Sequence, residues 1–256
     1  MTPGDPVAIR AAVGLLDFIK PKSALQKAAE SVREPYAQPD VRRDAMNKLF
    51  EIGTAEAHMA VLRRFTINAH GQIADESEKR ELVDRLAQVG EAVLPSLKEF
   101  IRTEKKSISF PVRAVCKILD KPEAIAFLKE TLQGYDPEDH RSVHAKNTLL
   151  ITLGEMVSGD EAELFVPYLA DHDDDVQMQA IAALERLAEE RTREALVGVC
   201  LSDSHAPRVQ RRAAQALLDL GWSVKDRYAD FHHELKDEYL LGKKGQLVKK
   251  KSPEDE

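Results

Sequence analysis

The chain has 256 residues and a net charge of −7, and it is 32% charged but only 5% aromatic. It has no apolar run near the roughly 20 residues that cross a bilayer. Its first residues lack the basic start and the small-residue cleavage site of a signal peptide. We therefore expect a cytoplasmic protein without a membrane span. The two cysteines, Cys116 and Cys200, are interpreted as free thiols.

The negative charge is concentrated in one block of the sequence. Residues 134–205 hold 5 Lys and Arg against 16 Asp and Glu, whereas residues 1–133 hold 21 against 19. A protein that grips nucleic acid along its length shows a basic stripe instead. We therefore do not expect a nucleic-acid partner.

The first predicted elements are two helices, near 6–19 and 22–34. Helical periodicity then runs through almost the whole chain, without convincing alternation of period two. Proline follows both Lys20 and Glu34. The residue before a proline disfavours helical geometry, so we expect a helix to end at each of these places. Because this pair lacks the signature repeated in the rest of the chain, we interpret residues 1–36 as N-terminal capping helices.

A repeated pattern with a spacing of 31 to 37 residues follows. In each clear copy, a valine is followed by a small or polar residue four positions later and by Leu or Ile eight positions later, which places all three on one helix face. The clear copies comprise Val41, Ala45 and Leu49; Val143, Asn147 and Ile151; Val176, Ala180 and Leu184; and Val209, Ala213 and Leu217. A shortened copy starts at Val112, and a degenerate copy ends at Gly90. Self-similarity at this period indicates a stack of helix pairs.

Six helix pairs are expected over residues 37–241. Their first helices are predicted near 40–52, 76–89, 108–119, 139–153, 174–188 and 206–220, and their partners near 54–68, 91–104, 122–133, 160–170, 191–201 and 223–241. Asp75 is expected to cap the helix that follows it. Residues 242–256 are rich in lysine and poor in apolar side chains, so we expect a disordered tail. Contact of this tail with an acidic partner, a membrane surface or RNA stays open beside a purely solvated tail.

The best copies of the repeat lie at residues 165–188 and 196–221. In each, a helix ends in leucine, a linker with acidic residues follows, and valine plus a small residue four positions later begin the next helix. The unit D/P-x-V-R/Q-x-x-A-x-x-x-L resembles the HEAT repeat over residues 38–221, and more specifically the short bacterial HEAT-like repeats related to those of phycobilin lyases. This resemblance implies an all-α fold, a right-handed α-solenoid of about six HEAT-like helix pairs plus an N-terminal helical cap. It also implies that the second helices line the concave face, which is commonly the binding surface.

Charged side chains on the second helices are the candidate partner-binding residues. Basic residues fall on the early second helices and acidic residues on the fourth, so a face built from these helices would be basic at one end and acidic at the other. The candidates are Arg63, Arg64, Lys98, Arg102, Lys129, Glu161 and Glu163, together with Asp173, Asp174 and Asp175 in an acidic linker. A set of solvated polar faces is the alternative interpretation.

Two patterns invite a metal site. Acids recur at alternate positions over residues 171–175, but Val176 stands where an EF-hand needs glycine and Ala182 where it needs the bidentate glutamate. Helix capping explains these acids better. His232 and His233 are adjacent and point to different sides of a helix, unlike the i, i+4 histidines of HExxH. We therefore expect no metal, no cofactor and no catalytic residue.

The sequence favours a non-enzymatic protein-binding scaffold or regulatory adaptor, with one or more protein partners whose identity it does not specify. The alternative is a HEAT-like enzyme or enzyme accessory, similar to the alkylpurine DNA glycosylases or to the chromophore lyases. The glycosylases resemble the chain in architecture, but they work with a basic concave face, aromatic residues and a catalytic Asp. A single tryptophan and the acidic central block argue against that activity.

Overall fold

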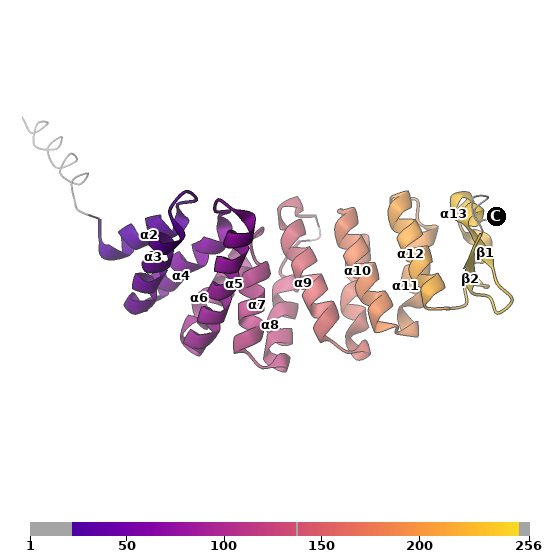
Figure 1. Cartoon of the computed structure of the whole chain (residues 1–256). Coiled ribbons are helices and arrows are strands. Elements are labelled where there is room, and N and C mark those ends of the chain that lie inside the picture. The colour runs from indigo at the N-terminus through magenta and orange to yellow at the C-terminus, as the bar shows by residue number, and fades with distance from the viewer. Residues whose placement is uncertain (1–21, 137, 251–256) are drawn as a thin grey trace, which may run out of the picture. The chain divides into compact units, whose positions relative to one another are not determined.

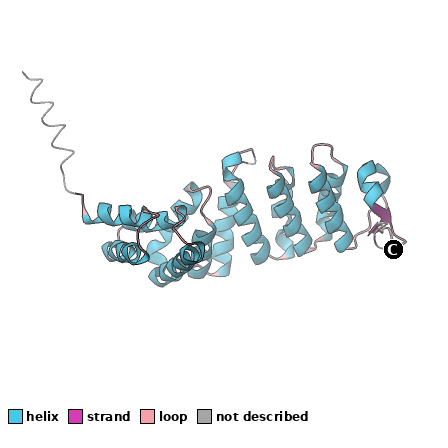
Figure 2. Ribbon diagram, turned by 45° about the horizontal axis from the view of Figure 1, so that its top comes forward, coloured by secondary structure: helices cyan, strands magenta, loops and turns pink. Residues whose placement is uncertain are grey.

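The computed structural model describes residues 22–136 and 138–250, which are mostly helical (Figures 1 and 2). The chain forms two compact units, residues 1–97 and 98–256, each described by itself below. The predicted all-α repeat solenoid is confirmed. The capping helix predicted near 6–19 lies outside the described residues.

Local signals set the ends of the helices in the first unit. Its elements are α2 Ala24–Arg33, α3 Pro39–Ile52, α4 Ala55–Leu62, η1 Arg63–Thr66, α5 Gln72–Val89, η2 Gly90–Val93 and the start of α6 Leu94–Thr103. Ser23 and Gln26 form a capping box before α2, in which Gln26 N donates to Ser23 Oγ at 3.1 Å and Ser23 N donates to Gln26 Oε1 at 2.9 Å. α3 ends at Gly53, whose φ of 65° is left-handed and favours glycine.

The start of α5 differs from the prediction. The helix begins at Gln72 rather than near residue 76, because Gly71, with a φ of 88°, reverses the chain just before it. Asp75 is therefore not the N-cap. It lies buried in the first turn of α5, where it takes part in an ion network.

Helices of the second unit stand in a row (Figure 1). Its further elements are α7 Ser109–Ile118, α8 Lys121–Gln133, η3 His140–Ser142, α9 Val143–Met156, η4 Gly159–Ala170, α10 Asp174–Leu187, η5 Glu190–Thr192, α11 Arg193–Leu201, α12 Pro207–Asp219, η6 Tyr228–Asp230, α13 His233–Glu238, β1 Tyr239–Leu241 and β2 Leu247–Lys249. α9 packs on α10, and α10 packs on α12. Each of these first helices is followed in the chain by its partner element: η4 follows α9, α11 follows α10, and the segment around α13 follows α12. The pairing of elements therefore follows the predicted repeat.

The valine pattern matches the buried face in α10 and α12 but not in α9. Val176 and Val209 are fully buried, whereas Ile151 of the pattern predicted for α9 is 46% exposed. The buried face of α9 instead holds Ala145, Leu149 and Leu153. The predicted register of this copy is wrong by two residues. The same i, i+4, i+8 spacing exists in both registers, and the packed register places the apolar Ala145, Leu149 and Leu153 against the neighbouring helices.

The chain after α12 also differs from the prediction. Only α13 is α-helical within the helix predicted over 223–241. β1 then pairs antiparallel with β2, with Leu240 opposite Val248. The expected disordered tail is therefore wrong for residues 242–250, and residues 251–256 lie outside the described part of the chain.

Period-two burial explains the hairpin. Tyr239 and Leu247 face inward and are buried, while Leu240 and Val248 face outward. The turn needs Gly245, because its φ is 88° and a Cβ there would lie 2.3 Å from Ser223 Oγ. These signals are short, and the run of lysines around them obscures the alternation in the sequence.

Candidate functional site

A groove of about 700 Å³ separates α8 from the start of η4 in the second unit. Its α8 wall is a stripe along the whole helix, made by Lys121, Pro122, Ile125, Ala126, Lys129, Glu130 and Gln133. The opposite wall is made by Met156, Val157, Ser158 and Glu161. Both walls contribute apolar side chains, so the groove offers an apolar strip bordered by charged groups.

The geometry of η4 explains why this groove is open. η4 is a 3₁₀ helix of 12 residues with Pro167 inside it, a length that 3₁₀ geometry rarely reaches. Proline has no backbone N–H and cannot continue an α-helical hydrogen-bond ladder. Because a 3₁₀ helix is tighter than an α-helix, the side-chain rows of η4 do not match those of α8, and a gap remains at the start of η4. Near the end of η4 the two elements meet, where Tyr168 Oη donates to Leu132 O at 3.2 Å.

Ion pairs lie along the rim of the groove. Lys129 Nζ lies 2.6 Å from Glu161 Oε2 and so bridges the two walls. Arg102 Nη2 lies 3.0 Å from Glu130 Oε1. Both pairs are at least one-third exposed, where such pairs contribute about 0–1 kcal/mol, so a charged ligand group can exchange with them. Lys121 is exposed and has no ion-pair partner within residues 22–136 and 138–250.

A second groove, of about 460 Å³, lies between α7 and α9. It is lined by Ser109, Val112, Arg113, Cys116, Thr148, Ile151, Thr152, Glu155 and Met156. Met156 borders both grooves, so the junction between the α7–α8 pair and the α9–η4 pair is open in both helix layers. Methionine is unbranched and flexible, and it can adapt to a ligand at such a place.

The junction between α9 and α10 is packed more tightly. The hollow there is about 140 Å³. A Cβ added at Gly154 would lie 3.1 Å from the Cβ of Ala183, which shows how closely the two helices approach. Arg186 Nη1 donates to Gly154 O at 2.6 Å and joins them further. The α9–α10 junction is therefore packed more tightly than the α7–α9 junction, so an open groove is not a feature of every junction.

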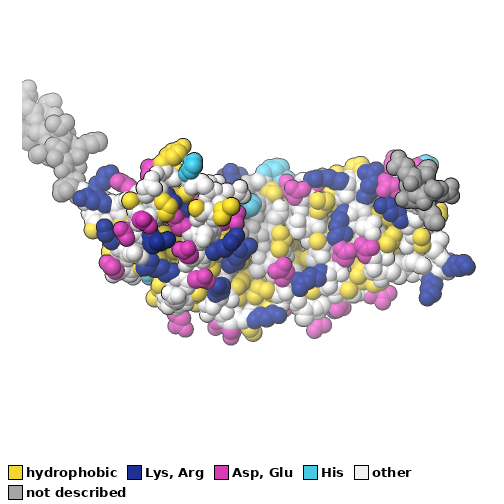
Figure 3. All heavy atoms as spheres, in the orientation of Figure 1, with side chains coloured by type: hydrophobic (Ala, Val, Ile, Leu, Met, Phe, Trp, Pro, Cys, Tyr) yellow, Lys and Arg dark blue, Asp and Glu magenta, His cyan; other side chains and the backbone are white. Residues whose placement is uncertain are grey.

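The predicted partner-binding residues of the second unit mostly contact neighbouring elements of the stack. Lys98 Nζ and Arg102 Cζ lie 5.3 and 5.1 Å from the centre of the Phe127 ring. Glu163 Oε1 lies 3.5 Å from Arg191 Nε. Figure 3 shows basic and acidic side chains interspersed over the face in view. Of the predicted residues, the groove brings together only Lys129 and Glu161, and it adds two charged residues that the sequence does not mark out, Lys121 and Glu130.

The acidic linker caps α10 and joins it to α12. Asp173 Oδ1 accepts hydrogen bonds from Asp175 N at 2.9 Å and Val176 N at 3.3 Å, as the capping interpretation predicts. Arg208 donates to Asp174 at 2.8 Å and to Asp175 at 3.1 Å. These acids therefore have partners inside the protein.

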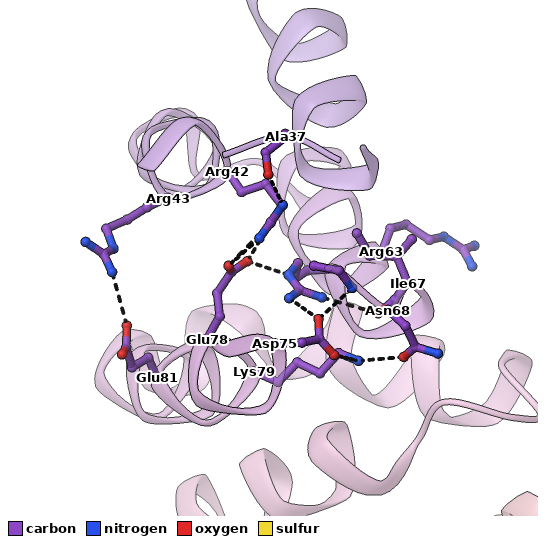
Figure 4. A network of polar contacts seen from close by, with 12 residues as sticks. Ala37, Arg42, Arg43, Arg63, Ile67, Asn68, Asp75, Glu78, Lys79 and Glu81 are labelled. Atoms are coloured by element: carbon purple, nitrogen blue, oxygen red, sulfur yellow. Dashed lines mark hydrogen bonds and ion pairs between the residues drawn. The ribbon is translucent and has the colours of Figure 1, made fainter. Parts of the chain in front are cut away.

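Arg64 is a correction to the predicted binding surface. Its side chain is 0% exposed, so it cannot contact a partner. It contacts Asp75 and Glu78, which belong to the network of polar contacts in Figure 4, whereas the side chain of the neighbouring Arg63 points away from that network. The sequence alone does not distinguish a charged side chain at a helix end that faces solvent from one that faces the core.

Five charged side chains form this buried network, which joins α3, η1 and α5. Arg64 Nε lies 2.5 Å from Glu78 Oε1, and Arg64 Nη2 lies 2.5 Å from Asp75 Oδ1. Arg42 Nη2 lies 2.9 Å from Glu78 Oε2, and Lys79 Nζ lies 2.7 Å from Asp75 Oδ2. Three cations thus enclose two carboxylates. Burial alone would raise the pKa of both carboxyl groups, but the hydrogen bonds from the basic side chains and, for Asp75, from Ala69 N outweigh it and lower both pKa values.

The R/Q position of the repeat was the sequence signal for such contacts. It follows the valine and is buried in several copies, as Arg42, Gln177 and Gln210 show. Gln177 Nε2 donates to Asp171 O at 2.5 Å, and Gln210 Nε2 donates to Ser202 O at 2.8 Å. These side chains hold the linkers against the first helices, so a polar residue beside the valine indicates an internal contact.

Comparison with known proteins identifies the repeat. A family model described as HEAT repeats matches residues 138–218. This part of the chain is a HEAT-repeat array. The match covers α9 to α12 of the second unit and includes one wall of the groove, and it confirms the resemblance to HEAT repeats for these residues. No curated protein and no solved structure matches the chain.

The described residues hold no cluster of metal ligands and no membrane-spanning helix. Within residues 22–136 and 138–250, the HEAT repeats included, no group of three or more His, Cys, Asp and Glu side chains is placed to hold a metal ion. None of the described helices is both long enough and apolar enough to span a bilayer.

Proposed function

We propose that this protein is a binding scaffold or regulatory adaptor that docks a helical segment of a protein partner in the groove between α8 and η4. The observation that carries the proposal is the groove itself, about 700 Å³ in volume and lined along one wall by a continuous stripe of α8. Stacked helical repeats generally work through such extended surfaces.

The dimensions of α8 favour a helical occupant. α8 has 13 residues and is therefore about 20 Å long, which matches an amphipathic helix of about three turns. Helices that bind in grooves insert apolar side chains at i, i+3 or i+4 and i+7. Pro122, Ile125 and Ala126 provide the apolar contact for such anchors.

Charge favours one orientation of the occupant. Lys121 stands at the start of α8 without an internal ion-pair partner among the described residues. Lys129 and Glu161 already neutralise each other across the groove. We therefore expect the partner helix to place an acidic residue near Lys121.

A displayed library of amphipathic helical peptides, selected against the full-length chain, tests this proposal. The variant Ala126→Arg fills the groove from an exposed position of α8. It should weaken the selected peptides by about tenfold or more, equivalent to about 1.4 kcal/mol. Gly198→Arg is the matched control, because Gly198 is exposed on α11 and a Cβ there has open space. Peptides that bind both variants as well as the original chain would contradict the groove assignment.

A further inference from the structure

The β1–β2 hairpin presents lysines without internal partners beside an outward-facing apolar pair. Lys243, Lys244, Lys249 and Lys250, here called the hairpin lysines, are all exposed, and none has an ion-pair partner within residues 22–136 and 138–250. By contrast, every arginine within residues 98–250 contacts a carboxylate, a backbone carbonyl or an aromatic ring. The hairpin thus gathers four lysines that have no ion-pair partner among the described residues, whereas Lys121 is a single lysine of this kind.

The apolar pair flanks the turn that carries Lys243 and Lys244, and Lys249 and Lys250 follow Val248 along the chain. Leu240 and Val248 are directly opposite each other in the register, and they are 48% and 42% exposed. They occupy the outward face of the hairpin, since Tyr239 and Leu247 fill the inward face. The last unit of a repeat array normally turns a polar face to solvent, so an aliphatic pair flanked by lysines at this place points to a ligand.

The hairpin is held in place before any ligand arrives. Val224 N donates to Gly245 O at 2.8 Å, and Tyr228 Oη donates to Tyr239 O at 2.9 Å. Arg211 Nε lies 2.6 Å from Glu238 Oε1, which joins α12 to the end of α13. These contacts fix the hairpin on the last helices. Lys243 and Lys244 at its turn therefore form one surface with the apolar pair, whereas Lys249 lies opposite Tyr239 in the register.

We propose that this surface binds the anionic face of a lipid bilayer. Positive charge selects an anionic ligand, and aliphatic side chains favour the boundary between headgroups and acyl chains. Two exposed aliphatic residues are too few for a stable protein interface, which buries about 1,200–2,000 Å² in total. Sequence-tolerant RNA binding relies on aromatic stacking, but the tyrosine of the hairpin is buried.

Figure 3 agrees with this assignment. Basic side chains project at the end of the view where Figure 1 places β1 and β2. The rest of the chain is acidic, with a net charge of −7 overall, so we expect attraction confined to the hairpin and strongly weakened by salt. Contact of one end of the stack with a bilayer leaves the groove between α8 and η4 available to its partner.

Co-sedimentation of the full-length chain with vesicles tests the proposal. The vesicles are phosphatidylcholine alone or phosphatidylcholine with about 30% phosphatidylserine, a membrane with the negative surface charge that attracts lysines. We expect binding to the anionic vesicles only, with loss at high salt. Lys243→Gln with Lys244→Gln should weaken it about 25-fold, since each lysine near such a surface contributes about fivefold in affinity. Leu240→Ser with Val248→Thr should weaken it further while keeping a β-branched residue in β2.

Matched controls distinguish binding through the hairpin from a general effect of positive charge. Lys48→Gln with Lys106→Gln removes the same charge from exposed positions outside the hairpin and outside the groove and should change binding by less than about twofold. Equal losses in the two double variants would overturn the proposal, as would absence of binding to anionic vesicles. Binding of poly-L-glutamate or poly(U), lost on removing the hairpin lysines while vesicles are ignored, would overturn it in favour of an acidic polypeptide or RNA. Circular dichroism establishes that each variant is folded.

Discussion

Glu78→Gln perturbs the buried network of the first unit at the group that holds most of it together. Glu78 accepts from Arg42 and from Arg64, and all five charged members of the network are less than one-tenth exposed. With Glu78 neutral, three buried cations share the single carboxylate of Asp75. Arg64→Met has the opposite consequence, because it leaves Arg42 with Glu78 and Lys79 with Asp75, two balanced pairs.

The difference in residual charge sets the expected magnitudes. Removing one partner of a buried pair destabilises a protein by about 3–5 kcal/mol, mainly because the remaining charge is uncompensated. Glu78→Gln leaves such an excess, so we expect the upper end, about 5 kcal/mol. Arg64→Met loses two charge-assisted hydrogen bonds but leaves balanced charge, so we expect the lower end, about 3 kcal/mol.

Urea denaturation followed by far-ultraviolet circular dichroism measures both free energies of unfolding. Glu81→Gln is the control on the same helix, because Glu81 is 62% exposed and lies 3.7 Å from the exposed Arg43. It should cost less than about 1 kcal/mol. The reasoning fails if Arg64→Met destabilises more than Glu78→Gln, or if either differs little from the control.

Three other predictions concern pH, helix packing and thiol chemistry. Because the folded-state pKa values of Asp75 and Glu78 are lowered, their stabilisation is fully present above the unfolded values of 3.8 and 4.5 and is lost as pH falls below them. Acid titration of stability should therefore show a steeper fall in the original chain than in Glu78→Gln. Gly198→Ala, at a helical position with open space, should stabilise the protein by about 0.5–1 kcal/mol. Gly154→Ala should instead destabilise the protein by about 1–2 kcal/mol, because the new Cβ meets Ala183. Thermal denaturation of the two variants measures the difference. Burial raises the pKa of Cys200 to about 12. At pH 8 the Cys200 thiol should therefore react with a disulfide reagent only after unfolding. Rapid reaction of two thiols in the native protein would contradict the burial of Cys200.

Part of the fold follows directly from local sequence signals. The helices α3, α7, α10 and α12 start and end within one residue of the prediction, because proline, glycine and the apolar spacing act within a few residues. α5 starts four residues earlier than predicted and α9 four residues later. The C-terminal hairpin does not follow from such local signals. Its alternation covers only three residues in each strand, which is too short to be recognised among lysines.

The candidate site was harder to predict than the fold. Lys129 and Glu161 were selected from the sequence for their charge, and they do border the groove. The groove itself depends on the 3₁₀ form of η4 and on the position of Met156, and neither follows from the charge pattern. Arg64 was assigned to the surface because its burial depends on Asp75 and Glu78, residues that only the folded chain brings beside it.

The sequence by itself determined the repeat, its period and the helical pairing, since these arise from side-chain spacing along single helices. Only the tertiary structure decided which face of α9 is buried, which charges are internal, and which junction of the stack stays open. The physical reason is that helix formation is settled by neighbours in the chain. The exposure of a charge and the width of a groove are settled by neighbours in space, about one repeat away in sequence, and no local pattern encodes their distance.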